Sequence, residues 1–394
     1  HNQMKRICFS YFLFLSVIYS GEFKEVKIDD ISSTRILSIA QDSTGFIWIG
    51  TDDGLNRYDG FQNRVYRSNI FDETTVSGNR IWKVHVDSSN TVWVLTDRGV
   101  CYYNVMLNQF ERIETGSRPQ HLHDEKNTIF VSTLNHGIYA INKETKSFKN
   151  YLFDPLDPFS ISSSKFSVLQ ANPTAVDGDG LWVGTLNGLN KLSLKTGQAK
   201  RLYSKKTNYV KSDTITAILL VDSTLYVGTP QGLSLYAGNK NEPAQLGGFE
   251  SSYILNIFLI KETNAVGIVS KNKLGVFEKS TVSKTIKTHT SLTLVHDLGS
   301  GQYLLNSPKD KNAVFLSADI DTDGIYKTKK IELPIKTTDI LVDNEGGAWL
   351  IGESGIARTS NIETPSVFTS IPHLKRTSFD QFDQKIYVLN QNKI

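Results

Sequence analysis

One short phrase returns along the whole length of this sequence. Its best copy reads FIWIGTDDGLNRY at 46–58. Seven further copies keep its order of an apolar run, a polar turn and a second apolar run; they lie at 92–103, 129–141, 181–192, 225–236, 266–277, 303–316 and 348–360. The copies at 266–277 and 303–316 lack both the Trp and the Gly-Thr of the phrase. Successive copies are spaced by roughly 36 to 52 residues, which is the period of one four-stranded propeller blade.

The repeated phrase predicts strands rather than helices. Its apolar residues alternate with polar ones, are rich in Val, Ile, Tyr and Trp, and are interrupted by Gly every few residues, whereas a helical repeat would show apolar residues at three-and-four spacing. We therefore predict an all-β chain. Its repeats should form a β-propeller of four-stranded antiparallel blades.

Each conserved type of residue within the phrase has an expected structural role. The Asp42 carboxylate can accept backbone N–H groups in a tight turn in which Gly45 adopts positive φ. Trp48 can fill the wedge between neighbouring sheets, while Gly50 lets the adjacent blade approach closely and Gly54 turns the chain. The same structural role is expected at the corresponding positions of other copies, which are Trp93, Trp182, Gly184, Gly228, Trp349 and Gly352.

No catalytic or metal site is expected in this segment. A catalytic phrase should occur once, whereas this one occurs about eight times with its aromatic, Gly and Thr positions kept. The chain has no GxSxG motif and no phosphate-binding loop. Its eight His residues lack metal-ligand spacing; His121 and His123 flank Leu122, but no third ligand is near in sequence. We therefore predict no catalytic residue, no metal and no cofactor.

The first residues are typical of a secretory signal. Met4, Lys5 and Arg6 precede an apolar run at 7–19, and Ser20 and Gly21 follow it, so residues 1–21 should be a signal peptide. The run is too short for an ordinary membrane span, although an uncleaved anchor remains an alternative. Export leaves Cys101 as the lone cysteine, which excludes an internal disulfide and predicts a buried small hydrophobe.

The charge balance and the two chain ends bear on partners and completeness. The 394 residues include 43 Lys and Arg against 40 Asp and Glu, and both signs are scattered, whereas nucleic acid requires a one-sided basic surface. No nucleic acid is therefore expected to bind this segment. Three residues precede Met4, and a ninth copy of the phrase is interrupted at Ile394; we expect this chain to be a piece of a longer protein.

At this point the sequence resembles a known family. Residues 42–58 match the pattern Asp-x-x-Gly-x-[Ile/Leu]-Trp-[Ile/Val]-Gly-Thr-x-x-Gly-[Leu/Ile]-x-x-Tyr of the two-component regulator propeller repeat, and the linkers at 66–84 and 151–169 are similar to those of the family. The resemblance implies a seven-bladed β-propeller at residues 22–330 and the start of a second propeller at residues 331–394. The sharp return of the phrase at 343–358, after the degenerate copies at 266–277 and 303–316, agrees with such a second start. The resemblance also implies the periplasmic sensor region of a Bacteroidetes-type hybrid two-component histidine kinase. It further implies a homodimer, an oligosaccharide ligand derived from a polysaccharide, and attachment to the inner membrane through a downstream segment.

Candidate ligand-binding residues follow from blade geometry. The connection into the inner strand and the turn between the second and third strands lie on one face of a propeller, so their residues converge around the central channel. Planar, hydrogen-bonding and aromatic groups of this kind suit sugar hydroxyls and acidic groups. The expected ligand-binding residues are Arg35, Asp53, Arg80, Trp82, Arg98 and His136, and the same positions also hold Asn135, Asn187 and Gln231. The alternative for each is a solvated loop end.

Two other classes of function remain open from the sequence. A propeller lyase or hydrolase would be revealed by turnover of a glycan panel. A secreted protein-interaction scaffold would bind a polypeptide partner and no sugar. The sensor is the preferred prediction, because the family resemblance spans nearly the whole chain.

Overall fold

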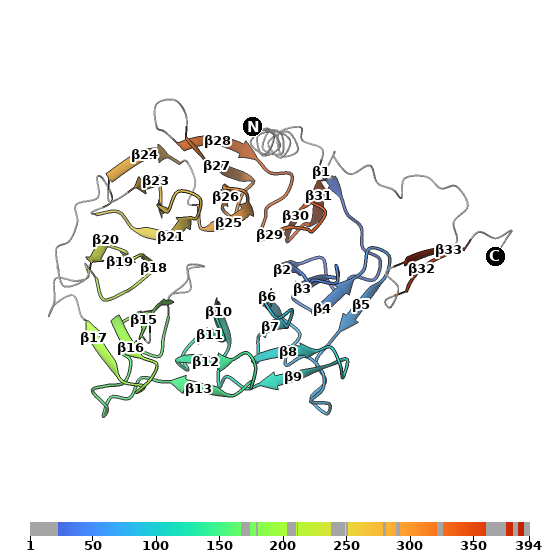
Figure 1. The fold of residues 1–394 in the computed structure, drawn as a ribbon, viewed down its shortest axis with the longest axis horizontal. Coiled ribbons are helices and arrows are strands. Elements are labelled where there is room, and N and C mark those ends of the chain that lie inside the picture. Colours follow the sequence, from blue (N-terminus) through green and yellow to red (C-terminus); the bar gives the residue numbers. More distant parts are fainter. Residues whose placement is uncertain are drawn as a thin grey trace.

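The computed structural model is an all-β ring (Figure 1). It describes residues 23–166, 174–178, 180–202, 210, 212–237, 249, 251–278, 281–288, 292–320, 326–359, 376–380 and 385–389. Every regular element within these residues is a β-strand, and none of them belongs to a helix that could cross a membrane. The predicted signal peptide at 1–21 lies outside the described residues.

Blades 1 to 4 follow chain order, each with its first strand nearest the centre of the ring (Figure 1). Their strands are β2 (Ile36–Gln41), β3 (Ile47–Thr51), β4 (Gly54–Tyr58) and β5 (Asn63–Tyr66); β6 (Ile81–Val86), β7 (Val92–Thr96), β8 (Val100–Asn104) and β9 (Gln109–Ile113); β10 (Pro119–Glu125), β11 (Thr128–Thr133), β12 (Ile138–Asn142) and β13 (Phe148–Tyr151); and β14 (Thr174–Asp177), β15 (Gly180–Thr185), β16 (Gly188–Ser193) and β17 (Ala199–Leu202).

Blades 5 to 7 continue around the ring, and blade 5 has three strands among the described residues. Their strands are β18 (Ala217–Val221), β19 (Thr224–Thr229) and β20 (Gly232–Ala237); β21 (Ile254–Ile260), β22 (Ala265–Ser270), β23 (Lys273–Glu278) and β24 (Thr281–Lys287); and β25 (Leu294–Gly299), β26 (Gln302–Asn306), β27 (Asn312–Ile320) and β28 (Tyr326–Glu332). A separate two-stranded sheet consists of β32 (Arg376–Asp380) and β33 (Lys385–Leu389).

The prediction of seven blades is wrong, because the ring contains eight. Strands β29 (Asp339–Val342), β30 (Ala348–Gly352) and β31 (Gly355–Thr359) form blade 8, and β1 (Phe23–Glu25) is its fourth strand. β1 pairs antiparallel with β31, with Phe23 opposite Thr359 and Glu25 opposite Ala357. The copy at 348–360, which we had expected in a second propeller, thus completes the same ring. The start of a second propeller stays a prediction.

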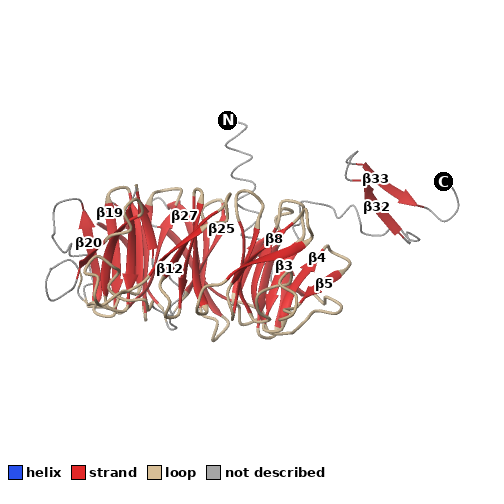
Figure 2. Cartoon of the chain, turned by 90° about the horizontal axis from the view of Figure 1, so that it is seen from below, coloured by secondary structure: helices blue, strands red, loops and turns tan. Residues whose placement is uncertain are grey.

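The core consists of eight buried apolar clusters, one at each junction between neighbouring blades. Trp48 of blade 1 packs with Ile81 and Val94 of blade 2, and Trp349 of blade 8 packs with Ile36 and Ile49 of blade 1. Trp48 is 1% exposed, so it fills the wedge between the sheets. An unbroken series of junctions makes the chain a closed ring, seen edge-on in Figure 2.

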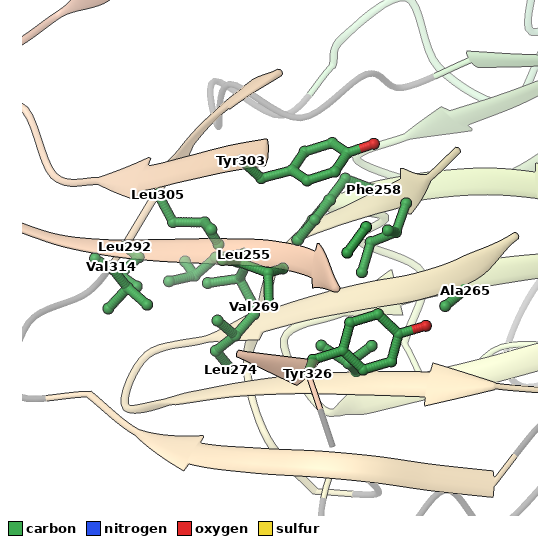
Figure 3. Packing of buried hydrophobic residues seen from close by; sticks show 14 residues of the cluster. Leu255, Phe258, Ala265, Val269, Leu274, Leu292, Tyr303, Leu305, Val314 and Tyr326 are labelled. Atoms are coloured by element: carbon green, nitrogen blue, oxygen red, sulfur yellow. The ribbon is translucent and has the colours of Figure 1, made fainter. Parts of the chain in front are cut away.

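The two degenerate copies pack with smaller aromatic rings in place of Trp. At the junction of blades 6 and 7, Phe258 and Tyr303 lie together with Leu255, and Tyr326 lies nearby (Figure 3). The ring centroids of Phe258 and Tyr303 are 5.7 Å apart. A Cβ at Gly267 would overlap the Phe258 ring. These blades therefore close the ring by a different set of aromatic residues.

The Asp of the phrase holds both its turn and its Trp. Asp42 Oδ1 accepts from the backbone N–H groups of Thr44 at 3.0 Å and Phe46 at 3.1 Å, and Asp42 Oδ2 accepts from Trp48 Nε1 at 2.7 Å. The same indole bond joins Asp87 to Trp93 and Asp343 to Trp349. Each of these pairs is six residues apart, so one spacing places the carboxylate under the indole in three blades.

Blade 4 lacks this bond because its hairpin is one residue shorter. Asp177 lies opposite Gly180 and precedes Trp182 by five residues. Its carboxylate pairs instead with Lys191 Nζ at 2.8 Å. The Trp182 Nε1 atom is buried and has no hydrogen-bond partner among the described residues. Blade 4 thus keeps the packing of the phrase without its indole bond.

Glycine at the end of the second strand makes room for the next blade. A Cβ at Gly50 would lie 2.6 Å from Ile81 Cγ2, and one at Gly228 would lie 2.7 Å from Ile254 Cγ2. Gly184 meets Ile215 in the same way. At Gly352 the obstacle is different, because a Cβ there would overlap the Lys336 carbonyl oxygen of the segment that enters blade 8.

Candidate functional site

β-Bulges lie at the start of four inner strands. The pairing of β2, β6, β10 and β21 with their neighbours shifts register around one unpaired residue each, and these residues are Leu37, Trp82, Gln120 and Leu255. A bulge bends its strand and redirects the extra side chain. Leu37, Trp82 and Gln120 line the same central cavity.

This central cavity has a volume of about 420 Å³. It is lined by residues at or just before the start of β2, β6, β10, β21, β25 and β29, which belong to blades 1, 2, 3, 6, 7 and 8. The volume lies within the usual range for a small-molecule pocket, about 300 to 1,000 Å³. Six blades therefore contribute to one site at one end of the channel.

The guanidinium groups of two arginines lie near the ring of Trp82. The guanidinium carbon of Arg80 is 4.1 Å from the ring centroid, and that of Arg118 is 4.8 Å from it. Arg118 lines the cavity together with Trp82. Within the described part of the chain, neither arginine forms an ion pair. This side of the cavity therefore carries uncompensated positive charge.

Three buried polar atoms in this group have no hydrogen-bond partner among the described residues. They are Trp82 Nε1, Arg80 Nε and Gln120 Oε1. A buried polar atom without a partner costs roughly 1–3 kcal/mol, and such atoms are uncommon in folded proteins. Two of them are donors and one is an acceptor, so a ligand bearing both hydroxyl and anionic groups would complement them after a side-chain rotation.

A second group of lining residues is built around Asp339. Asp339 Oδ2 accepts from Lys83 Nζ at 2.9 Å and from Ser38 Oγ at 2.9 Å. Burial acts to raise the pKa of Asp339, but Lys83, His296 and Ser38 outweigh it and hold that pKa below its ordinary value. These contacts join blades 8, 1 and 2. Lys83 is thus already neutralised by a carboxylate, unlike Arg118.

His296 is the second titratable residue in this group. Its Nδ1 atom lies 3.8 Å from Asp339 Oδ1, and its Nε2 atom is 3.0 Å from Asn306 Oδ1. Burial lowers the pKa of His296, and the opposing attraction of Asp339 does not restore it. Burial therefore favours the neutral form of His296 over the charged form.

Only two of the six ligand-binding residues predicted from sequence meet at this cavity, namely Trp82, which lines it, and Arg80, which lies against Trp82. Arg35 instead pairs with Glu353 at 3.0 Å, and Asp53 pairs with Arg67 at 3.1 Å. Both pairs are exposed, so they carry the features of surface ion pairs.

The other two predicted residues lie in turns away from the cavity lining. Arg98 is exposed in the turn between β7 and β8, where its backbone N–H donates to Thr96 Oγ1. The ring of His136 lies against Gly116 and 6.5 Å from the Tyr139 ring. Asn135, Asn187 and Gln231 also lie in the turns that follow the second strands of their blades. Their binding roles remain predictions.

Sequence reasoning missed Arg118, Gln120, Lys83, His296 and Asp339. A signal for Arg118 was present. The segments 35–38, 80–83 and 118–121 each place an arginine two residues before the bulged residue. Arg35 and Arg80 were selected by this position, and the same criterion selects Arg118. No such pattern pointed to Asp339, because the sequence analysis placed the segment of blade 8 in a second propeller.

The other reactive groups among the described residues form no second cluster. Cys101 is fully buried between blades 1 and 2, and burial raises the pKa of its thiol to about 11; the prediction of a buried small hydrophobe is confirmed. In the part of the chain that the structure describes, no three His, Cys, Asp or Glu side chains gather in a metal-binding group. His121 lines the central cavity, whereas His123 lies 3.6 Å from Glu125.

Comparisons with known proteins agree with the propeller architecture. The extracellular domain of BT3049 from B. thetaiotaomicron, described as a hybrid two component system, matches with a TM-score of 0.53 and 19% identity over 93% of this chain and 46% of that one. The extracellular domain of BT4673, described in the same terms, gives a TM-score of 0.51 and 18% identity over 86% and 39%. Saccharomyces cerevisiae Sqt1 gives a TM-score of 0.60 at 12% identity, over 87% of this chain and all of that one.

Sequence comparisons locate the match more narrowly. "Histidine kinase P4" of Formosa agariphila is 44% identical over 50 residues, which are 13% of this chain and 4% of that protein. The chain also spans less than half of the two B. thetaiotaomicron domains. The family model "Two component regulator propeller" matches residues 30–53, which include β2 and the first part of the best copy of the phrase. The chain therefore carries the repeat of the two-component regulator propeller family, as its sequence indicated.

Proposed function

We propose that this chain is the extracytoplasmic ligand-sensing domain of a hybrid two-component signalling protein. Its likeness to extracellular domains of such systems supports an exported sensor. In this proposal it binds an oligosaccharide derived from a polysaccharide and controls a histidine kinase elsewhere in the full-length protein. The full-length protein would be a homodimer in the inner membrane, with this domain in the periplasm.

The central cavity is the observation that carries the proposal. Its size suits a short oligosaccharide, and it combines an indole with guanidinium, amide and imidazole groups. Aromatic faces pack against the apolar faces of sugar rings, while a few placed polar groups fix the orientation of a ligand. The site draws on six blades, so a ligand that fills it contacts most of the ring at once.

Control of a kinase requires only that the ligand bind two arrangements of the protein with different affinities. If two arrangements of a dimer are in equilibrium, a ligand that binds one of them more tightly shifts the population toward it. A rigid ring with a central site can supply this difference when neighbouring segments contact the same face. The shift is bounded by the ratio of the two affinities.

Calorimetric titration of the purified chain with a panel of oligosaccharides tests the proposal. We expect saturable binding that Trp82→Ala weakens strongly, because the indole lines the cavity. Phe61→Ala is the matched control, since Phe61 is an aromatic residue 83% exposed on the turn between β4 and β5. Binding that is unaffected by Trp82→Ala would place the ligand elsewhere, and the absence of any saturable binding would refute a sugar-binding role.

The same samples distinguish the enzymatic alternative. Chromatography of each oligosaccharide after long incubation reveals any cleavage. A lyase or hydrolase would give shorter products in proportion to the amount of protein, whereas a sensor returns its ligand unchanged. Product formation that Trp82→Ala abolishes would therefore replace the sensor proposal by a catalytic one.

A further inference from the structure

We infer that the central cavity selects an anionic sugar, whose carboxylate or sulfate group binds at the guanidiniums of Arg80 and Arg118 beside Trp82. That the ligand is a sugar rests on the proposed function. That the sugar is anionic rests on the charges around the cavity. It concerns one subsite, defined by Arg80, Trp82, Arg118 and Gln120, which we call the arginine subsite.

Three consecutive blades place an arginine at the same point, and only one of the three has a carboxylate partner. Arg35, Arg80 and Arg118 each lie two residues before the bulged residue of an inner strand. The Arg35 guanidinium is 3.0 Å from Glu353. In the described residues no ion pair involves Arg80 or Arg118. The positive charge of the arginine at this position is therefore neutralised by a carboxylate in blade 1 and has no such partner in blades 2 and 3.

The two uncompensated arginines are close together, because both guanidiniums contact one indole ring. Both side chains are partly buried. Like charges that share a partly desolvated site repel each other more than they would in water. An anion at this point replaces that repulsion by attraction, and the planar guanidinium can offer two parallel N–H donors to a carboxylate or a sulfate.

The remaining charges around the cavity do not cancel this positive site. Asp339 is the carboxylate among the described lining residues, and it already binds Lys83 and Ser38. Asp97 also contacts the subsite; it is exposed and accepts from the backbone N–H of Arg80 at 3.2 Å. The cavity thus has one neutralised side at Asp339 and one cationic side at Arg118.

The unpartnered polar atoms add an independent observation. Trp82 Nε1 and Arg80 Nε are buried donors, and Gln120 Oε1 is a buried acceptor, all without partners among the described residues. Two donors suit the oxygens of an anion, while the amide oxygen suits a neighbouring sugar hydroxyl. An acidic sugar presents both kinds of group on adjacent carbon atoms, which a free inorganic anion does not.

The test compares oligosaccharides that differ only in charge. One pair is an oligogalacturonate and its methyl ester, and the other is a galactan oligosaccharide with and without sulfate esters. Calorimetry on the full chain should show that at least one charged member binds about 10- to 100-fold more tightly than its neutral counterpart, the range expected for a charge-assisted hydrogen bond. The pair that shows the difference identifies carboxylate or sulfate as the source of the anion.

Variants assign the difference to the arginine subsite. Arg118→Gln should remove most of the charge preference, and Arg118→Lys should keep part of it because the charge remains but the planar fork is lost. Arg64→Gln is the matched control, since it removes one exposed positive charge from the outer strand β5. Melting temperatures close to that of the parent chain show that each variant is folded.

The outcomes separate this inference from the proposed function. If charged and neutral members bind equally and Arg118→Gln changes neither, the anionic subsite is wrong while the sugar-binding role stands. If no oligosaccharide binds, the chain is titrated with inorganic sulfate at constant ionic strength and followed by Trp fluorescence, with Trp82→Phe as the reference. This titration tests whether the subsite binds an anion, independently of any sugar. Saturation that Arg118→Gln abolishes would keep the anion site without the sugar; no saturation would overturn both.

Discussion

The indole bond of the repeated phrase can be measured by comparing Trp48→Phe with Trp182→Phe. The two indoles are equally buried, at 1% and 2% exposure, and each lies near one basic side chain of its own blade. Trp48 Nε1 donates to the Asp42 carboxylate at 2.7 Å, whereas Trp182 Nε1 has no partner in the described chain. Phenylalanine removes the same ring atoms at both sites, but removes a hydrogen bond only at Trp48.

The expected magnitude follows from that single difference. A hydrogen bond to a charged group contributes about 1.5–3 kcal/mol, so Trp48→Phe should lower the free energy of unfolding by about that much more than Trp182→Phe does. Truncation to alanine at Trp48 should cost about 3–5 kcal/mol, because it leaves a void in the junction of blades 1 and 2. Asp42 keeps its two backbone donors in each variant, so its turn should persist.

Urea unfolding followed by circular dichroism measures these differences. An eight-bladed ring can unfold in more than one step, so the comparison uses the first transition and requires equal m-values. A Trp182→Phe variant destabilised as much as Trp48→Phe would refute the contribution assigned to the Asp42 bond. A Trp48→Ala variant with an unchanged midpoint would refute the wedge role of the indole.

The cavity histidine, the junction glycines and the linker loops give three further tests. Burial depresses the pKa of His296 below its ordinary 6.5, so the unfolded chain binds a proton at a higher pH than the folded chain does. The free energy of unfolding should therefore fall as pH drops below about 6.5, by at most about 1.4 kcal/mol per pH unit. Urea unfolding of His296→Asn should show a weaker dependence of this free energy on pH, and an equal dependence would contradict the reasoning. Gly352→Ala should lower the melting temperature more than Gly184→Ala, because its Cβ meets a backbone carbonyl rather than a side-chain methyl. Arg112 donates to several carbonyl oxygens of the loop at 69–76, so Arg112→Ala should speed limited proteolysis there, and an unchanged cleavage rate would show that the loop does not depend on it.

The local features of the fold could be predicted from the sequence because each depends on residues that are close in sequence. A carboxylate six residues before an indole can reach it across one hairpin, as in Asp87 and Trp93. Threonine at the end of the second strand caps the next turn, as Thr51 Oγ1 does with the Gly54 carbonyl at 2.9 Å. Such contacts recur with the phrase, so the alternation of strands and turns could be predicted from it.

The eight copies of the phrase equal the eight blades in number, but the sequence did not show that the eighth copy closes the same ring, because ring closure depends on contacts between distant segments. β1 is a short strand at the start of the chain, and it pairs with β31 more than 300 residues later. Nothing in its sequence, Phe23 to Glu25, marks a partner. The bulges were equally hidden, since one extra residue in an inner strand leaves the apolar pattern almost unchanged. The cavity side chains that depend on those bulges, such as Gln120, were therefore missed.

The error in the blade count and the omission of Asp339 from the candidate site have a common physical origin. Asp339 belongs to blade 8, and it neutralises Lys83 of blade 2 and binds Ser38 of blade 1. A seven-bladed ring without blade 8 would leave Lys83 uncompensated, so every basic residue around the channel would look equally available to a ligand. Closure by blade 8 removes Lys83 from that set and leaves Arg80 and Arg118 as the charged pair. The selectivity that we infer for the cavity is thus a consequence of how the ring closes.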